Sequence, residues 1–317
     1  MQTTALLDCA PQAAGFAEEA IDGLTQTPKT LPCKFFYDAR GSALFDKICE
    51  LDEYYPTRTE MGIMQAHAPE MSDLLGTDCR LVEYGSGSSL KTRVLLDNAR
   101  SLAAYVPVDI SREHLERTAA GLARAYPDIP IVPVCADYTQ PFDVPPARAA
   151  RTVIYFPGST IGNFPPPQAR EFLARIAQVC GQGGGLLIGV DLKKSAAVLE
   201  PAYNDCNGVT AAFNLNLLVR MNQELGADFD LAQWEHLAFY NSVQGRIEMH
   251  LVSMRAQTVS IGGARIAFGA GERIHTESSY KYAVDEFACL AESAGFLVQR
   301  VWTDDEHLFS VQYLTIA

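Results

Sequence analysis

Several features that this chain of 317 residues lacks narrow the class of protein to which it belongs. Its longest apolar runs, such as residues 185–190, are far too short to cross a bilayer. Residues 1–20 contain acids and no basic stretch followed by an apolar one, so a secretory signal is not expected. A net charge of −13, with scattered Lys and Arg, argues against a nucleic-acid partner. We therefore expect a cytoplasmic monomer that has neither a membrane nor a nucleic acid as partner.

Metal and disulfide motifs are missing as well. The eight cysteines include no C-x-x-C pair, and no group of His and Cys has the spacing of a zinc site. Reduced thiols in a cytosolic protein are the simplest interpretation. The six histidines form neither a catalytic triad nor a metal-binding pattern. We therefore predict no metal site and assign no histidine to catalysis.

What the sequence does contain, from residue 57 to residue 190, is an alternation of amphipathic helices and short apolar segments. The first helix is expected over 57–76, with a possible capping box formed by Thr57 and Glu60. Later helices are expected over 90–102, after an N-cap at Ser111, and from the prolines at 165–167. Strands are expected at 79–84, 103–108, 131–135, 152–156 and 184–190. This order is typical of parallel βα units.

The alternation breaks after residue 194. A helical stretch over 208–225 is followed by expected strands at 246–255, 258–261 and 264–268, which indicates a second structural unit. A helix over 284–294 and two strands at 296–303 and 308–316 then predict a C-terminal antiparallel hairpin. Five parallel strands with such a hairpin are typical of the Rossmann-like, doubly wound α/β sheet of class I methyltransferases. A dehydrogenase domain would more often continue with parallel units.

The first predicted strand is followed by a glycine loop. Gly85 and Gly87 allow a ligand to approach the backbone closely. Leu90 stands where a dinucleotide fingerprint would have its third glycine, which argues against a dinucleotide cofactor. A nucleotide-type ligand of another kind is therefore expected beside this loop.

Acidic residues end the next two predicted strands. Asp109 lies at about the distance after the glycine loop at which an acid binds ribose hydroxyls, although it could instead cap the following helix. Asp137 could accept the adenine amino group and Tyr138 could cover the base, whereas a turn-forming aspartate is the alternative at 137. The glycine loop and the two acids together favour S-adenosylmethionine, because its cationic sulfonium suits acidic surroundings and it has no pyrophosphate to cradle.

Longer motifs occur at 36–46 (FYDARGSALFD), 53–60 (EYYPTRTE), 158–163 (GSTIGN), 208–214 (GVTAAFN) and 246–249 (RIEM). From about residue 30 onward the chain resembles the L-histidine Nα-methyltransferases of ergothioneine biosynthesis. The resemblance implies trimethylation of the α-amine of L-histidine to hercynine, with S-adenosylmethionine as the cofactor. It also implies a methyltransferase domain, here predicted at 59–194 and 283–317, and a separate α+β substrate-binding domain, here predicted at 1–58 and 195–282.

The resemblance also implies roles for individual residues. The implied cofactor contacts are Gly85, Lys91, Asp109, Asp137 and Tyr138. The implied histidine contacts are Tyr54, Asn163, Tyr203, Met249, Glu277 and Ser279, and the residues expected nearest to the chemistry are Tyr37 and Asn163. Taken alone, Lys91 could be a solvated lysine, Asn163 a turn-forming residue, and each tyrosine a structural one.

The spacing of Glu277 and Ser279 suits recognition of an imidazole. Residues two apart on an extended segment point to the same side, so both could contact one ring, with the carboxylate accepting a ring N–H. A solvated strand face is the alternative. Tryptophan or tyrosine remains a rival substrate, but an indole offers a carboxylate less to bind. A nucleotide-binding oxidoreductase and a non-catalytic binding module are rivals of other classes, which the missing third glycine and the intact acids oppose.

Overall fold

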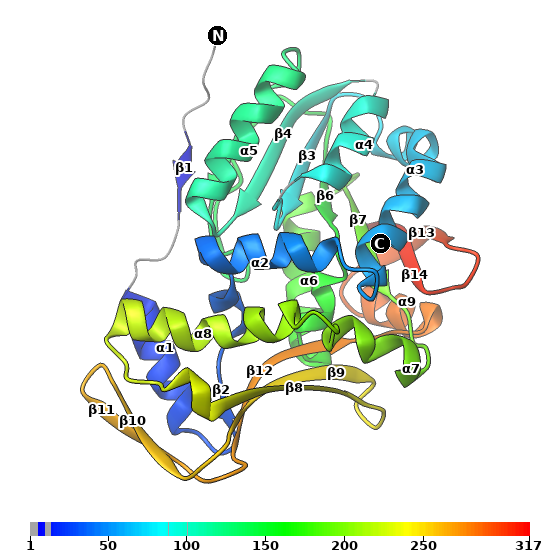
Figure 1. Ribbon diagram of the computed structural model, residues 1–317. Helices are drawn as coiled ribbons and strands as arrows, with labels where there is room; N and C mark the ends of the chain where they lie inside the picture. The colour runs from blue at the N-terminus through cyan, green and yellow to red at the C-terminus, as the bar shows by residue number, and fades with distance from the viewer. Residues whose placement is uncertain (1–5, 10–13, 88, 100) are drawn as a thin grey trace. The chain divides into compact units, whose positions relative to one another are not determined.

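The computed structural model describes residues 6–9, 14–87, 89–99 and 101–317 (Figure 1). These residues form two compact units. Unit 1 contains 6–9, 56–193 and 280–317 of the described residues, and unit 2 contains 14–55 and 194–279. The sequence analysis placed the boundaries at 58/59, 194/195 and 282/283, and it assigned the start of the chain to the other domain. Residues 7 and 8 belong to unit 1 because they pair with its sheet.

Unit 1 is built on an eight-stranded sheet. From one edge to the other, its strands are β1 (Leu7–Asp8), β5 (Val134–Cys135), β4 (Leu102–Asp109), β3 (Cys79–Tyr84), β6 (Arg151–Phe156), β7 (Gly185–Asp191), β14 (Phe309–Ile316) and β13 (Phe296–Thr303). Neighbours from β1 to β7 run parallel, whereas β14 is antiparallel to both β7 and β13. This order confirms the predicted class I methyltransferase sheet with its C-terminal hairpin.

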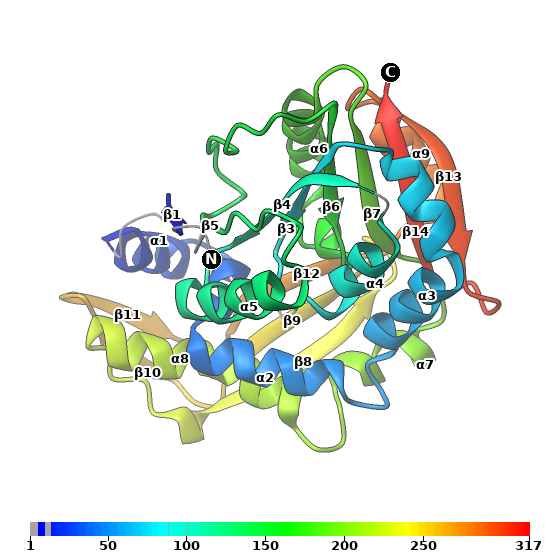
Figure 2. The same cartoon turned by 90° about the horizontal axis from the view of Figure 1, so that it is seen from above.

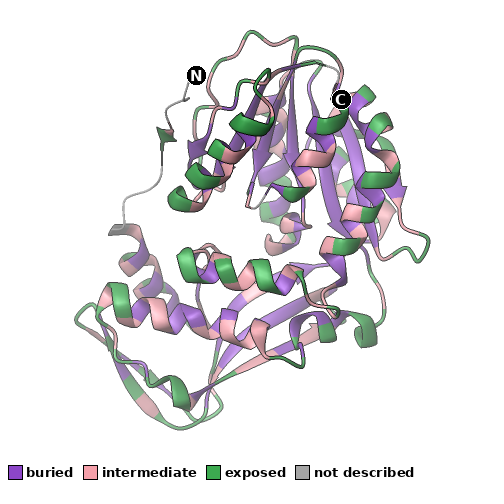
Figure 3. Cartoon of the chain, turned by 45° about the horizontal axis from the view of Figure 1, so that its top comes forward, coloured by how far each residue is buried: buried purple, intermediate pink, exposed green. Residues whose placement is uncertain are grey.

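Helices cover both faces of this sheet, as Figure 2 shows. On one face, α6 (Pro166–Cys180) and α9 (Val284–Glu292) contribute Phe172 and Phe287 to an apolar core. On the other face, α3 (Tyr55–Leu75), α4 (Leu90–Asn98) and α5 (Arg112–Ala125) contribute Met64, Leu95 and Leu122 to a second core. The strands between them are buried along most of their length (Figure 3). Burial on both faces explains why these strands are nearly continuous apolar runs in the sequence.

Unit 2 combines a four-stranded sheet with helices. The sheet order is β2 (Lys29–Thr30), β12 (Arg273–Tyr280), β9 (Arg246–Ser253) and β8 (Trp234–Asn241), and a separate hairpin is formed by β10 (Gln257–Ile261) and β11 (Ala264–Phe268). The helix α8 (Val209–Leu225) packs on β8 and β9 and on α2 (Ala39–Cys49). The remaining helices are α1 (Ala14–Thr25) and the single turn α7 (Ala196–Leu199).

Some predicted elements differ from the structure. The expected helix over 90–102 ends at Asn98, since Leu102 already belongs to β4. The expected strand at 131–135 is reduced to β5, with an isolated bridge between Tyr105 and Ile131. β8 and β12 were not predicted, because their partly exposed, polar residues give no continuous apolar signal. In the part of the chain that the structure describes, no helix combines the length and the apolar character that crossing a membrane requires.

The predicted capping box of the first helix is wrong. α3 begins at Tyr55, so Thr57 lies inside the helix and does not precede it. Glu60 is completely buried and binds groups outside its own helix. Pro56 occupies the second helical position, where a missing N–H costs nothing, and this explains why the helix starts earlier than the Thr57 signal suggested.

Candidate active site

The glycine loop folds back onto the neighbouring strand of unit 1. Gly85 has a φ of +73°, and the N–H groups of Gly85 and Ser86 both donate to the carbonyl of Val108, at 2.9 and 3.2 Å. The next glycine, Gly87, donates its N–H to Asp109 Oδ2 at 3.0 Å. A positive φ is inexpensive only for glycine, so this tight path depends on the residue type at position 85. The loop after β3 and the acid that ends β4 are therefore joined directly.

Asp109 also organises the start of the next helix. Its Oδ1 accepts the N–H of Ser111 at 2.9 Å, and Ser111 is the N-cap of α5 without a capping bond from its own side chain. Burial raises the pKa of Asp109 above its ordinary value, although the N–H donors oppose this. Asp109 thus holds the N-cap residue of α5 in place of capping the helix itself, and its role toward the cofactor stays a prediction.

Asp137 and Tyr138 follow the carboxyl end of β5. Asp137 is 5% exposed and accepts the N–H and the hydroxyl of Thr139 at 2.9 and 2.5 Å, so the turn considered as an alternative does form. The ring of Tyr138 stacks on Tyr84, with centroids 5.6 Å apart and planes at 12°. A Cβ on Gly85 would lie 3.7 Å from Tyr138 Cε1, which places Tyr138 beside the glycine loop.

Lys91, in the first turn of α4, is not the solvated lysine that the sequence alone allows. Its ammonium group forms an ion pair with the carboxylate of Glu60, and its side chain is only 17% exposed. Both oxygens of Glu60 also accept the N–H of Gly158, at 3.1 and 3.0 Å. Glu60 was predicted to belong to a helix cap, because its spacing from Thr57 matches a capping box. The motif at 53–60 was the only signal that could have pointed to it.

Asn163 ends a short 3₁₀ helix, Thr160–Asn163, which lies between β6 and α6 in unit 1. The turn before it is held in its left-handed conformation at Ser159, where φ is +56°, by the N–H of Asp191, which donates to the Ser159 hydroxyl at 2.9 Å. Asp191 in turn pairs with Lys281 at 2.8 Å, and both side chains are 1% exposed. Asn163 therefore sits on a well-fixed segment whose first residue, Gly158, is bound by Glu60.

The tyrosines predicted near the substrate, Tyr37, Tyr54 and Tyr203, gather in unit 2. The hydroxyl of Tyr203 donates to Ser279 Oγ at 2.9 Å, and the rings of Tyr54 and Tyr203 meet edge to face at 6.3 Å. Phe45 contacts Tyr54 at 6.3 Å and Tyr37 at 5.7 Å between centroids. Burial raises the pKa of Tyr54, and nearby groups that include Tyr203, Glu277 and Tyr37 raise it further. The structure thus brings together five of the predicted residues: Tyr37, Tyr54, Tyr203, Glu277 and Ser279.

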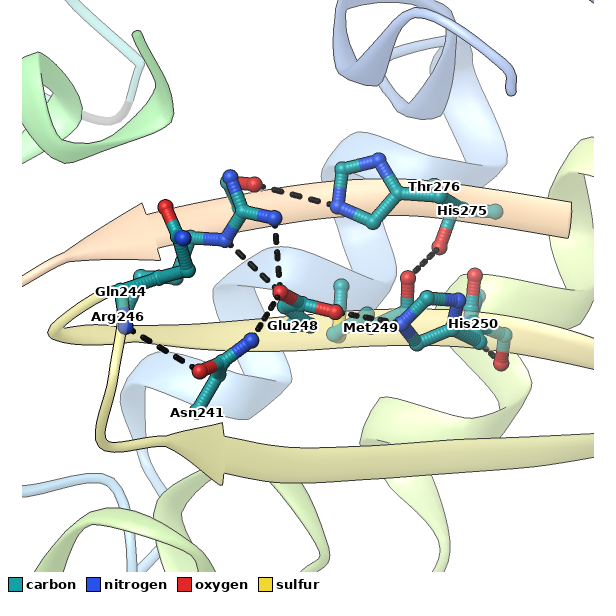
Figure 4. A network of polar contacts seen from close by, with 10 residues as sticks. Asn241, Gln244, Arg246, Glu248, Met249, His250, His275 and Thr276 are labelled. Carbon is teal, nitrogen blue, oxygen red and sulfur yellow. Dashed lines mark hydrogen bonds and ion pairs between the residues drawn. The ribbon is translucent and has the colours of Figure 1, made fainter. Parts of the chain in front are cut away.

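Met249 lies on β9, the strand beside β12. It is 2% exposed, and its carbonyl accepts the hydroxyl of Thr276 at 3.1 Å. Figure 4 shows the polar network around it, in which Glu248 binds Arg246 Nη2 at 2.7 Å and His250 Nε2 at 3.0 Å. Although burial opposes the shift, the hydrogen bonds from Arg246, His250 and Asn241 lower the pKa of Glu248 to about 2. This network fixes the strand that carries Met249.

His236 supports the Tyr203 segment, which sequence analysis did not foresee. Its Nε2 lies 2.9 Å from the carbonyl of Tyr203, and its Nδ1 lies 2.9 Å from Asn214 Nδ2. Since the carbonyl can only accept, Nε2 carries the proton and Nδ1 accepts from Asn214. Burial lowers the pKa of His236, which favours this neutral form. Asn214 belongs to the motif at 208–214, and this motif therefore supplies one of the hydrogen bonds that hold His236 against the Tyr203 carbonyl.

The fold and these strand ends define the class of protein. A class I methyltransferase sheet carries a glycine loop, Asp109 and Asp137 at the ends of β3, β4 and β5, and the protein is an S-adenosylmethionine-dependent methyltransferase. Residues 16–316 match the model of the family described as histidine-specific, S-adenosylmethionine-dependent methyltransferases, and the chain belongs to this family.

The sequences of similar proteins agree with this family. The chain is 43% identical over 302 residues to the histidine N-alpha-methyltransferase of Mycolicibacterium smegmatis, covering 92% of this chain and 94% of that protein. It is also 43% identical over 292 residues to the protein of that name from Mycobacterium tuberculosis, covering 90% of each. Ergothioneine biosynthesis protein 1 of Neurospora crassa is 33% identical over 285 residues, which cover 87% of this chain and 32% of that longer protein.

Proposed function

We propose that this enzyme transfers methyl groups from S-adenosylmethionine to the α-amine of L-histidine, ending at the trimethylated product hercynine, a step of ergothioneine biosynthesis. The observation that carries the proposal is the cluster of Tyr54, Tyr203, Glu277 and Ser279 in a chain of the histidine-specific family. The names of the two mycobacterial relatives support the same reaction.

The cofactor is assigned to the strand ends of unit 1. Asp109 would bind the ribose hydroxyls, Asp137 the adenine amino group, and the ring of Tyr138 the face of the base. Because Gly85 has no side chain, a ligand can approach its backbone. The ring of Tyr138 lies beside it, since a Cβ on Gly85 would be 3.7 Å from Tyr138 Cε1. Lys91 Nζ would lie 3.8 Å from a Cβ on Gly158, and this ammonium group would bind the methionyl carboxylate. When bound, S-adenosylmethionine supplies the electrophilic methyl group.

The amino acid is assigned mainly to unit 2. Glu277 would accept an N–H of the imidazole, and Ser279, which already accepts from Tyr203, would contact the same ring. Tyr54 and Tyr203 would wall the site and Met249 would line it. In unit 1, Asn163 would orient the amino-acid backbone through the directional bonds that an amide can make. Tyr37 would lie at the amine.

These side chains suit a reaction that needs a neutral amine. An α-amine has a pKa of about 8, so most of it is protonated near neutral pH and lacks the lone pair that attacks the methyl group. Aromatic walls disfavour the charged form by desolvation and so assist loss of the proton. The faces of Tyr37 and Tyr54 also accommodate the quaternary ammonium of the product, since π systems attract such cations. Orientation supplies much of the remaining acceleration.

The position of the methyl groups tests this proposal. Purified protein would be incubated with S-adenosylmethionine and L-histidine, and the product would be fragmented in a mass spectrometer. We expect loss of trimethylamine, because all the methyl groups are then on the α-nitrogen. Methyl groups that stay with the imidazole fragment would refute Nα-methylation.

We further propose that the enzyme acts as a cytoplasmic monomer without a nucleic-acid partner. The net charge of −13 supports the last point, because binding to phosphate backbones relies on basic surface. Size-exclusion chromatography with light scattering, at several protein concentrations, would test the monomer.

A further inference from the structure

The most buried carboxylate near the cofactor residues is Glu60, which no role in the reaction has yet accounted for. Its side chain has 0% exposure and lies on α3, away from the glycine loop in sequence. A buried carboxylate is costly unless every charge and lone pair finds a partner. Glu60 has such partners. The ammonium group of Lys91 donates to Oε2, and the N–H of Gly158 lies 3.1 Å from Oε1 and 3.0 Å from Oε2.

The surrounding backbone is shaped to hold this carboxylate. A Cβ on Gly189, in the middle of β7, would lie 2.2 Å from Glu60 Oε1, so only glycine leaves room for it there. A Cβ on Gly158 would lie 3.8 Å from Lys91 Nζ, which places the ammonium group over the same loop. The carboxylate is thus fixed by the sheet on one side and by a backbone N–H on another, before any ligand binds.

The consequence falls on Lys91. A lysine on a surface helix samples many rotamers, whereas this one is tied to a fixed anion and is only 17% exposed. An ammonium group has three donors, and one of them is directed to Glu60, which leaves others for a second anion.

We propose that Glu60 is a positioning residue that holds the Lys91 ammonium group for the methionyl carboxylate of the cofactor. The proposal rests on the function proposed above for Lys91. Glu60 does not touch the cofactor; it acts by fixing the charge, direction and location of the lysine. A purely structural Glu60 would tie α3 to the loop after β6 and would have no specific effect on cofactor affinity.

A double-mutant cycle separates these two roles. The affinity for S-adenosylhomocysteine, which shares the methionyl end, would be measured by calorimetry in wild type, Glu60→Gln, Lys91→Met and the double variant. We expect Glu60→Gln to weaken binding by roughly 10- to 100-fold, the scale of a hydrogen bond to a charged group. In the Lys91→Met background, the same substitution should change the affinity by less than about 3-fold, since residues that act through one another are not additive.

The matched control is Glu272→Gln. Glu272 in unit 2 also accepts a lysine and a glycine N–H, from Lys29 at 2.7 Å and from Gly269 at 2.6 Å. Its removal should leave the cofactor affinity unchanged. Equal losses for Glu60→Gln with and without Lys91 would overturn the proposal while leaving the role of Lys91 intact. No loss of affinity in Lys91→Met would overturn both the proposal and the assigned role of that lysine.

Glu60→Asp keeps the test decisive if Glu60→Gln does not fold. Aspartate retains the charge but is one methylene shorter, so it cannot bind Lys91 and the Gly158 N–H together. We expect it to fold and to bind S-adenosylhomocysteine more weakly than wild type but more tightly than Lys91→Met. Wild-type affinity in a folded Glu60→Asp variant would contradict the need for a precisely held lysine.

Discussion

Glu83, the next-to-last residue of β3, is a buried carboxyl group bound by two hydroxyls. Thr92 donates to its Oε2 at 2.5 Å, and the Tyr105 hydroxyl donates to the same oxygen. Burial raises the pKa of Glu83 to about 8, although these donors and Lys91 oppose the shift. The carboxyl group of Glu83, two residues before Gly85 in the sequence, is therefore largely protonated at neutral pH.

This pKa predicts a pH-dependent stability. A folded pKa above the unfolded value of 4.5 means that the contribution of Glu83 is fully present below pH 4.5 and is lost as the pH rises toward 8. Glutamine keeps the shape and accepts the same hydroxyls without titrating. Relative to wild type, Glu83→Gln should gain about 3 to 4 kcal/mol of unfolding free energy between pH 5 and pH 8. Urea unfolding at the two values checks this, and identical pH dependence in the two proteins would contradict it.

In the proposed function, Glu277 is the residue that would select an imidazole side chain. Glu277→Ala should weaken binding of L-histidine by roughly 10-fold or more, the scale of a charge-assisted hydrogen bond, and should change affinity for S-adenosylhomocysteine by less than about 2-fold. Calorimetry with each ligand measures both. Glu235→Ala, which removes an exposed acid from β8 of the same sheet, is the control. Equal losses for the two ligands would mean that Glu277 is structural.

The sequence predicted the places of individual residues at strand ends better than it predicted their hydrogen-bond partners. Gly85, Asp109 and Asp137 were predicted from their places after strands, and the structure puts a bond between the loop of Gly85 and Asp109. The partners of Lys91 could not be foreseen, because Glu60 is 31 residues away on another helix. Contacts of this kind depend on how elements pack, which local patterns do not encode.

Among the elements, β9 and β12 each carry a histidine whose pKa is lowered in the folded protein, so that acid destabilises the fold there. Burial, together with the nearby His250 and Arg246, lowers the pKa of His275 to about 4, and Glu248 opposes this shift. Burial also lowers the pKa of His250. These strands are therefore most stable with both imidazoles neutral. They also hold Met249 and Glu277.

The sign of the resulting pH effect follows from linkage. Below pH 6.5 the unfolded chain protonates His275, but the folded chain does so only near pH 4, so stability falls as the pH drops through this interval. His275→Gln should reduce the slope of unfolding free energy against pH by up to about one proton between pH 6.5 and 4. Thermal or urea unfolding at half-unit intervals measures the slope. An unchanged slope would show that His275 titrates normally.

The helices and strands differed in how well they could be predicted from the sequence. The strands β3, β6 and β7 are apolar throughout because helices bury both faces, and they were predicted within a residue or two. β8 and β12 were missed, since charged and polar residues interrupt the apolar pattern of both strands. The serines and the glutamate of β12, two of which are proposed to contact the substrate, are the residues that interrupt its apolar pattern.

At the scale of the whole molecule, the chain enters unit 2 twice, at residues 14–55 and 194–279. The break after residue 194 was visible in the sequence because the βα alternation stops there. The start of the long segment of unit 1, at Pro56, was not visible in the sequence, because α3 continues from Tyr55 in unit 2 into Pro56 without interruption. A helix that spans a boundary leaves no composition change to detect.

The choice of amino acid tests the central claim most directly. Purified protein would be given S-adenosylmethionine and an equimolar mixture of the twenty amino acids, and every methylated product would be identified by mass at early and late times. If the proposed function is correct, L-histidine alone gains methyl groups, and the trimethylated form accumulates. Methylation of tryptophan, tyrosine or another amino acid in preference to histidine would contradict it.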